Sequence, residues 1–400
     1  MPQQALSNVK VLDLTWYIAG PYCTKLLADY GADVLKVEKP GEGDPARRIG
    51  PFFGNDPHPE KSGLFLYLNT SKKGITLNLK TVAGVRLFKE LVREADVLVE
   101  SYSPGTMARL GIDYETLEKI NPRLVMTSIS NFGQTGPYRD YKAAHITEDA
   151  MGGWMHFVGE PDREGLQVGG WVTHFVAGFG AAVATAAALY HQRESGQGQY
   201  VDLSMMEAMV ATQNYNMVLY QYVGRTRKRR GNILVFGSGH IAACQDGYLG
   251  VNAYTHPQWE ELFNFIGMPE MLEEPKYKSY LGRQEYAREV TERIDPWFKD
   301  KKKEETFHAA QERRLPFGLI ATTEDLLNLV QLRAREWFVD VEHPATGRVT
   351  YPGAPFKMSK TPWGMKCRAP LLGEHNREVF GDSLGHSPEE LVRLRETGVI

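Results

Sequence analysis

The 400-residue sequence predicts an α/β fold, and two observations carry that prediction. Short apolar, β-branched runs alternate with amphipathic helical segments through residues 9–129, which is the pattern of a parallel sheet covered by helices. The composition is that of a globular protein, with 42% hydrophobic, 11% aromatic and 24% charged residues. We therefore expect a doubly wound, Rossmann-like large domain rather than a fibrous or disordered chain.

The opening residues predict a strand, a helix and a second strand. Residues 9–15 (VKVLDLT) form a short apolar run, and a helix follows from Pro21 to Gly31, where glycine suits a left-handed C-cap. Residues 32–37 (ADVLKV) read as the next strand, which completes a βαβ unit. The pattern recurs as a helix over 81–95, a strand over 96–100, a helix around 114–120 and a strand over 124–129.

The character of the sequence changes after residue 224, where the basic run RTRKRRGN reads as a connection. Short helices separated by Pro, Gly and charged residues follow from about 255 to 335, with an aromatic candidate core of Trp259, Phe263, Phe265, Trp297 and Phe298. We predict a large domain at 1–224, a smaller, mostly helical or α+β domain at 225–340, and a return to the large domain at 341–400. In that last part, 347–353 reads as a strand and 388–396 as a helix.

Composition and motifs argue against several classes of function. A net charge of −3 gives no field that would capture nucleic acid. Three cysteines, far apart and outside any CxxC spacing, favour neither a disulfide framework nor structural zinc, and we expect a cytoplasmic protein. The uncharged run 175–190 is shorter than the roughly 20 residues that span a bilayer, so we expect a core helix and no membrane partner. The first turn has no GxGxxG motif, so no nucleotide redox cofactor is expected.

Six segments carry a resemblance to a known enzyme family. They are 11–47 (VLDLTWYIAGPYCTKLLADYGADVLKVEKPGEGDPAR), 69–80 (NTSKKGITLNLK), 95–112 (ADVLVESYSPGTMARLGI), 121–138 (NPRLVMTSISNFGQTGPY), 193–208 (RESGQGQYVDLSMMEA) and 369–379 (APLLGEHNREV). In this order they resemble the family III coenzyme A transferases, which include formyl-CoA, carnitine and benzylsuccinate CoA transferases. The resemblance implies a Rossmann-type large domain, two interlocked chains, and acyl-CoA and an organic acid as substrates, with succinyl-CoA a candidate donor. It also implies ping-pong transfer through an aspartate, which forms a mixed anhydride and then an enzyme–CoA thioester.

The resemblance also places the CoA contacts. Lysine and arginine in these segments suit the phosphate groups of CoA, although each cation also suits a solvated surface. The contacts would be Ile18, Ala19, Lys39, Leu77, Lys80, Ser101, Tyr102, Ser103, Arg109 and Lys142. Residues 236–240 (FGSGH) resemble a glycine-rich loop that covers the active site of the family, and they suit an ordinary turn equally well.

The sequence departs from the family at the catalytic position. The family's aspartate lies four residues before a glycine, and here His174 stands four residues before Gly178. No Asp or Glu occurs over 165–190, so a small shift of alignment restores no carboxylate. His145, Asp149 and His174 fit no recognised ligand spacing, and we expect no metal.

Several functions remain open for such a chain. It would be a subunit that lost its nucleophile and pairs with a homologous, Asp-bearing chain, or a non-catalytic CoA-binding subunit. Alternatively, His174 is the general base of a racemase or isomerase type of enzyme that moves a proton on a CoA thioester. The last alternative is a transferase that uses another carboxylate, Glu148 or Asp149 first, and that pairs with a copy of itself.

Overall fold

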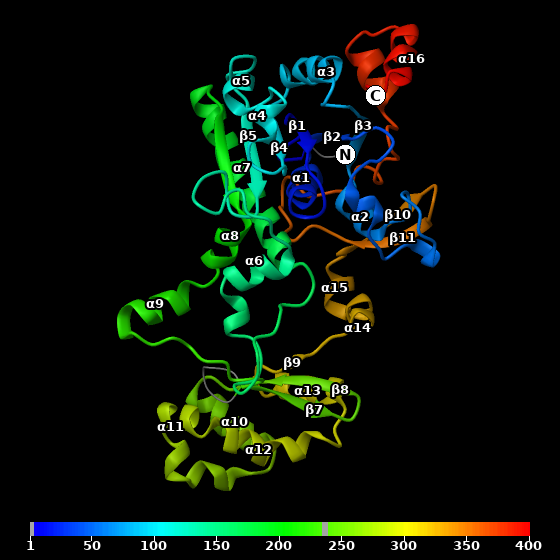
Figure 1. Cartoon of the computed structure of the whole chain (residues 1–400). Helices are drawn as coiled ribbons and strands as arrows, with labels where there is room; N and C mark the ends of the chain where they lie inside the picture. The colour runs from blue at the N-terminus through cyan, green and yellow to red at the C-terminus, as the bar shows by residue number, and fades with distance from the viewer. Residues whose placement is uncertain (1–3, 234–238) are drawn as a thin grey trace. The chain divides into compact units, whose positions relative to one another are not determined.

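The structure is a computed structural model and describes residues 4–233 and 239–400. The chain divides into two compact units (Figure 1). The large unit runs through Trp154 and adds Val168–Met217 and Ala334–Ile400, and the small unit comprises Met155–Gln167 and Val218–Arg333. Sequence analysis placed the limits at 224 and 340. As limits of independently folding domains, these boundaries stay a prediction.

A six-stranded parallel sheet forms the centre of the large unit, with the order β3-β2-β1-β4-β5-β6. The strands are β1 (Lys10–Leu14), β2 (Asp33–Glu38), β3 (Lys72–Thr76), β4 (Val97–Glu100), β5 (Val125–Ser130) and β6 (Gln199–Ser204). The direction of winding reverses between β1 and β4. Open α/β sheets bind ligands outside the carboxyl ends of the strands at such a switch point. The predicted Rossmann-like α/β fold is confirmed.

Helices cover both faces of this sheet, so its strands are apolar on both sides. Leu87 and Phe88 of α3 (Val82–Val92) pack on one face, with Phe380 from the C-terminal segment. On the other face α1 (Ala19–Asp29) packs against α7 (Val172–Ser195). The remaining elements of the large unit are α2 (Gly63–Leu68), α4 (Thr106–Arg109), α5 (Tyr114–Glu118), α6 (His145–Met151), α8 (Met205–Ala211), the hairpin of β10 (Phe338–His343) and β11 (Gly347–Pro352), and α16 (Pro388–Glu396).

Helix α7 contains the uncharged run that the sequence predicted to be a core helix. A Cβ atom at Gly178 would lie 2.4 Å from the carbonyl oxygen of Ala19, so only glycine permits the observed approach of α7 to α1. The opposite face of α7 is exposed at Phe179, Val183 and Tyr190. By length and composition alone α7 would be able to cross a membrane, but its buried face packs as a core helix does.

Buried charges fix the loop that follows β1. The carboxylate of Asp13 accepts hydrogen bonds from Thr15 and pairs with Lys72 at 3.0 Å, while Lys36 pairs with Asp44 at 2.9 Å. Burial alone would raise the pKa of Asp13, but the charges of Lys36 and Lys72 lower it well below its ordinary range. A satisfied buried network of this kind holds its backbone in one arrangement. It therefore positions the loop that enters the candidate site.

The small unit has its own core. Trp259, Phe263 and Phe298 are buried, and Phe265 and Trp297 pack against them, as the sequence predicted. Its antiparallel sheet contains β7 (His240–Cys244), β8 (Gly247–Val251) and β9 (Gly318–Leu319), and its helices are α10 (His256–Phe265), α11 (Tyr280–Glu285), α12 (Ala287–Phe298), α13 (Lys303–Glu312) and α14 (Thr323–Asn328). Helices α9 (Asn214–Val223) and α15 (Val330–Ala334) extend across the limits between the units. Most of the predicted glycine-rich loop, 236–238, lies outside the described residues.

Candidate active site

A cavity of about 510 Å³ opens at the carboxyl edge of the sheet, next to the switch point. Its walls come from the loops that follow β1, β2, β3 and β4, because parallel strands deliver their carboxyl ends to one edge. The backbone N–H of Trp16 donates to the Ser101 hydroxyl at 2.9 Å and thereby joins the loops after β1 and β4. Six predicted CoA contacts line this cavity: Lys39, Leu77, Lys80, Ser101, Tyr102 and Ser103.

An adjoining cavity of about 290 Å³ shares residues 101–103 and adds Arg109 and Lys142. The two cavities thus bring together eight of the ten predicted contacts. Ile18 and Ala19 line neither cavity and are buried at the start of α1. As CoA contacts, all ten remain a proposal.

Two of the predicted cationic CoA contacts, Lys39 and Arg109, differ in the side chains that they bind. Lys39 forms an ion pair with Glu42, and this hydrogen bond lowers the pKa of the glutamate. Arg109 donates from Nη2 to the Thr106 hydroxyl at 2.8 Å and has no carboxylate partner among the described residues. Its guanidinium charge is therefore the less compensated of the two. Sequence reasoning missed Arg48 and Arg139, which also line the cavities, although the criterion of cations in these loops would have found both.

His174 lies in the first turn of α7 and faces three side chains of α6. Its Nε2 atom is 3.5 Å from Oε2 of Glu148, and its ring centre is 5.4 Å from that of His145. The Nε2 atom of His145 is 3.4 Å from Oδ2 of Asp149. His145, Glu148 and Asp149 share one face of α6 because residues three and four apart are neighbours on a helix. Sequence analysis missed this arrangement because it did not predict α6.

Burial controls the protonation of this cluster. It raises the pKa of Glu148 to about 7, with a smaller contribution from the charge of Asp149. Burial, and then the neighbouring His145, lower the pKa of His174 to about 4. Near neutral pH His174 is therefore an uncharged imidazole with a free lone pair, which is the form of a base or a ligand. The hydroxyl of Thr173 donates to Oδ1 of Asp149 and holds that carboxylate in place.

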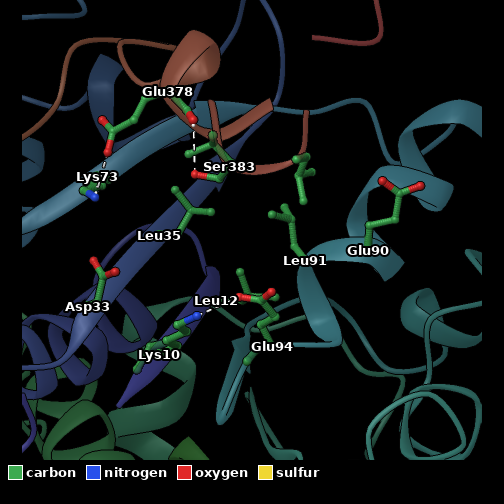
Figure 2. Close-up of a pocket in the computed structure, with 14 residues that line it drawn as sticks. Lys10, Leu12, Asp33, Leu35, Lys73, Glu90, Leu91, Glu94, Glu378 and Ser383 are labelled. Carbon is green, nitrogen blue, oxygen red and sulfur yellow. Dashed lines mark hydrogen bonds and ion pairs between the residues drawn. The ribbon is translucent and has the colours of Figure 1, made fainter. Parts of the chain in front are cut away.

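A further cavity, of about 170 Å³, lies near the amino ends of strands β1 and β2 (Figure 2). Lys10 and Asp33, the first residues of β1 and β2, contribute to its lining. Lys10 pairs with Glu94 at 2.7 Å, and Lys73 pairs with Glu378 at 2.8 Å, as the dashed lines in Figure 2 mark. Two of its cations thus already have anionic partners, and it lies at the amino ends of the strands. We assign no substrate to this cavity.

Relatives with established names match the chain from end to end. It is 35% identical to the succinyl-CoA–D-citramalate CoA-transferase of Chloroflexus aurantiacus, over 100% of this chain and 99% of that protein. It is 31% identical to the mouse succinyl-CoA:glutarate CoA-transferase, over 99% of this chain and 90% of that protein. It is 34% identical to the formyl-CoA:oxalate CoA-transferase of Streptomyces avermitilis, over 99% of this chain and 100% of that protein.

A solved structure and a family model agree with these relatives. The structure of a CAIB/BAIF family protein from Brucella suis superposes with a TM-score of 0.85 at 29% identity, covering 95% of this chain and 99% of that one. The model of "CoA-transferase family III" matches residues 6–376. These matches confirm the predicted enzyme class, a CoA transferase. Enzymes of this class take acyl-CoA as a substrate and need no metal for the transfer. The chain belongs to CoA-transferase family III.

Proposed function

We propose that this chain is the CoA-binding subunit of an enzyme that moves CoA between succinyl-CoA and an organic acid. In this proposal His174 carries no acyl group, and a homologous chain with an aspartate at that position supplies the nucleophile. Two relatives named for succinyl-CoA, one of them paired with glutarate, support the donor. The cavities at the switch point support a retained CoA site. The assembly would be a cytoplasmic pair of interlocked chains.

The sequence pattern carries the proposal: by the resemblance, His174 takes the position of the family's carboxylate, four residues before Gly178. The close contact of Gly178 with Ala19 supports this alignment, because the contact fixes which face of α7 meets α1. An imidazole has no carboxyl carbon, so it is unable to become the enzyme–CoA thioester through which the family transfers CoA. The loss of the aspartate therefore removes both halves of the transfer from this chain, because neither the mixed anhydride nor the thioester is able to form on it.

The two nearby carboxylates do not compensate for this loss in the present arrangement. Glu148 is 1% exposed and Asp149 is fully buried, whereas the side chain of His174 is 18% exposed. The imidazole is thus more accessible than either carboxylate to a bulky thioester. This difference favours the subunit proposal over a transferase that uses Glu148 or Asp149.

A second function, proton transfer on a CoA thioester, is supported by the position and the uncharged form of His174, although its lowered pKa also makes the imidazole a weaker base. Its lowered pKa keeps it uncharged near neutral pH, and Glu148 lies 3.5 Å behind it. A neutral imidazole at a partly exposed position is able to accept a proton from the carbon next to a thioester carbonyl.

Transfer assays on purified protein test the proposal. The lone chain, given succinyl-CoA and a panel of dicarboxylic acids, is expected to form no new acyl-CoA above background. Coexpression with an Asp-bearing homologue should restore transfer, and His174→Ala in that complex should leave its rate nearly unchanged. Robust transfer by the lone chain would contradict the proposal, and Glu148→Gln and Asp149→Asn would then identify the carboxylate. If His174 is instead a general base, His174→Ala should slow deuterium exchange at the α-carbon by about 10²- to 10⁴-fold.

A further inference from the structure

We propose that His145, Glu148 and His174 bind a divalent transition-metal ion of the zinc class, with Asp149 supporting His145. We call these four residues the α6–α7 cluster. One ligand atom from each of the first three residues lies within 4.8 Å of the other two. The inference stands on these side chains alone and does not rest on the proposed function.

The separation between His174 and Glu148 is that of two metal ligands and not of hydrogen-bond partners. His174 Nε2 and Glu148 Oε2 are 3.5 Å apart, and Oε2 has no hydrogen-bond partner among the described residues. A hydrogen bond to a carboxylate would bring these atoms to about 2.8 Å. Zinc bonds of about 2.0–2.2 Å at tetrahedral angles instead place two ligand atoms about 3.4 Å apart. The observed separation therefore matches an edge of a zinc tetrahedron.

The two carboxylates of the cluster also have no permanently charged partner among the described residues. Glu148 and Asp149 are both almost fully buried, and no lysine or arginine in the described part of the chain pairs with either carboxylate. The ionised form of a buried carboxyl group is costly without a compensating positive charge, and a bound divalent ion would stabilise that form. Within the part of the chain that the structure describes, these carboxylates interact with the two imidazoles and the Thr173 hydroxyl, and none of these three groups carries a permanent charge.

The donor atoms indicate which metal would bind. Two imidazole nitrogens and one carboxylate oxygen suit zinc and its transition-metal neighbours, whereas calcium and magnesium prefer oxygen ligands. Neither ring nitrogen of His145 has a hydrogen-bond partner among the described residues, and its Nε2 lies 3.4 Å from Oδ2 of Asp149. Asp149 thus lies beside His145 without a hydrogen bond to it, in the place that carboxylates supporting metal-bound histidines commonly occupy. Three protein ligands leave a fourth position for water or a small anion.

The experiment measures metal in tag-free protein, because a polyhistidine tag would itself bind zinc. Protein from zinc-supplemented cultures, dialysed without chelator, should contain close to one zinc per chain by elemental mass spectrometry. Cobalt substitution should give the visible absorption of a four-coordinate site. His145→Ala, Glu148→Gln and His174→Ala should each reduce zinc affinity at least 10-fold in a competition titration with a chromophoric chelator. Asp149→Asn should reduce it by about 10- to 100-fold, as loss of a supporting carboxylate does.

His191→Ala is the matched control, because His191 is exposed on the same helix α7 and should leave zinc content unchanged. Glu148→Gln keeps the shape of the side chain, so it tests the ligand even if an alanine variant folds poorly. Wild-type protein that stays metal-free, with a melting temperature unaltered by added zinc or by chelator, would overturn the site. So would equal zinc loss in the His191 variant. The transfer assay reads a different property, so the two proposals fail separately.

Discussion

Arg109 and Lys39 show how neighbouring residues change what a cation offers to a phosphate. Lys39 already pairs with Glu42, so a phosphate would have to compete with that carboxylate. Arg109 hydrogen-bonds only to the neutral Thr106 hydroxyl among the contacts described for it, and it lines the same cavity as Arg139 and Lys142. A planar guanidinium also binds phosphate oxygens in pairs, which an ammonium group does not. Arg109 should therefore contribute more to CoA binding than Lys39.

We predict that Arg109→Ala weakens CoA binding, because it removes a charge-assisted contact worth about 1.5–3 kcal/mol. Lys39→Ala should have a smaller effect, since its removal frees Glu42 from an existing ion pair. Isothermal calorimetry with CoA measures both dissociation constants.

Arg86→Ala is the control for this measurement, because Arg86 is an exposed arginine on α3 that lines neither cavity. It removes the same charge from the chain and should leave the dissociation constant unaltered. An unchanged constant for Arg109→Ala would show that Arg109 makes no contact with CoA. An equal loss in the Arg86 variant would instead indicate a long-range charge effect.

At the scale of elements, two glycines of α7 have different surroundings, and only one of them meets α1. A Cβ atom at Gly178 would lie 2.4 Å from the Ala19 carbonyl oxygen, which is backbone and has little freedom to move. At Gly180 the nearest atom to an added Cβ is in the side chain of Leu203, at an ordinary 3.6 Å. The same substitution thus meets two different environments two residues apart.

We predict that Gly178→Ala lowers the free energy of unfolding of the large unit by about 1–3 kcal/mol, the usual cost of overpacking. Gly180→Ala should raise it by up to about 1 kcal/mol, because alanine favours a helix interior. Urea denaturation followed by circular dichroism measures both variants, with Gly180→Ala as the matched control. Equal effects of the two substitutions would contradict the close approach of α7 to α1.

The helices and strands that the sequence predicted are those in which apolar residues recur at regular spacing. The strand, helix and strand predicted over residues 9–37 are confirmed, because most of their buried positions are apolar or small, although Asp13, Lys25, Asp29 and Lys36 are buried as well. Strand β3 was not predicted because it reads KKGIT, and its buried Lys72 is satisfied by the ion pair with Asp13 and by hydrogen bonds to Pro21, Thr24 and Asn69. Helix α6 escaped because HITEDAM has no apolar stripe. The contacts that support these two elements come from segments distant in the chain.

The residues of the candidate site also fall into those that the sequence predicted and those whose arrangement it did not predict. The resemblance to the family III CoA transferases predicted the lysines and arginines in the loops. The parallel topology explains why those loops meet at the carboxyl edge of the sheet. The α6–α7 cluster was readable only in part. His174 and its neighbours were all noticed in the sequence, but their juxtaposition depends on how α6 packs beside α7. Sequence spacing between two helices gives no information on that distance.

At the scale of the whole molecule, the large unit leaves an apolar helix face without a partner among the described residues. Phe179 is 42% exposed, Val183 56% and Tyr190 71%, all on the face of α7 opposite the sheet. Exposed apolar residues that adjoin one another mark interaction sites on globular proteins. A second chain, either a copy or the homologous Asp-bearing subunit, is the partner that the family resemblance implies.

We predict that the pure chain associates through this face and does not persist as a monomer of 45.1 kDa. Light scattering coupled to size exclusion should report at least twice that mass. Val183→Asp should shift the mass toward the monomer, because burying an unpaired carboxylate in an interface is costly. Val82→Asp is the matched control, since Val82 is 90% exposed at the start of α3, which packs on the other face of the sheet from α7. A wild-type monomer, or equal dissociation by both variants, would show that the α7 face is not the site of association.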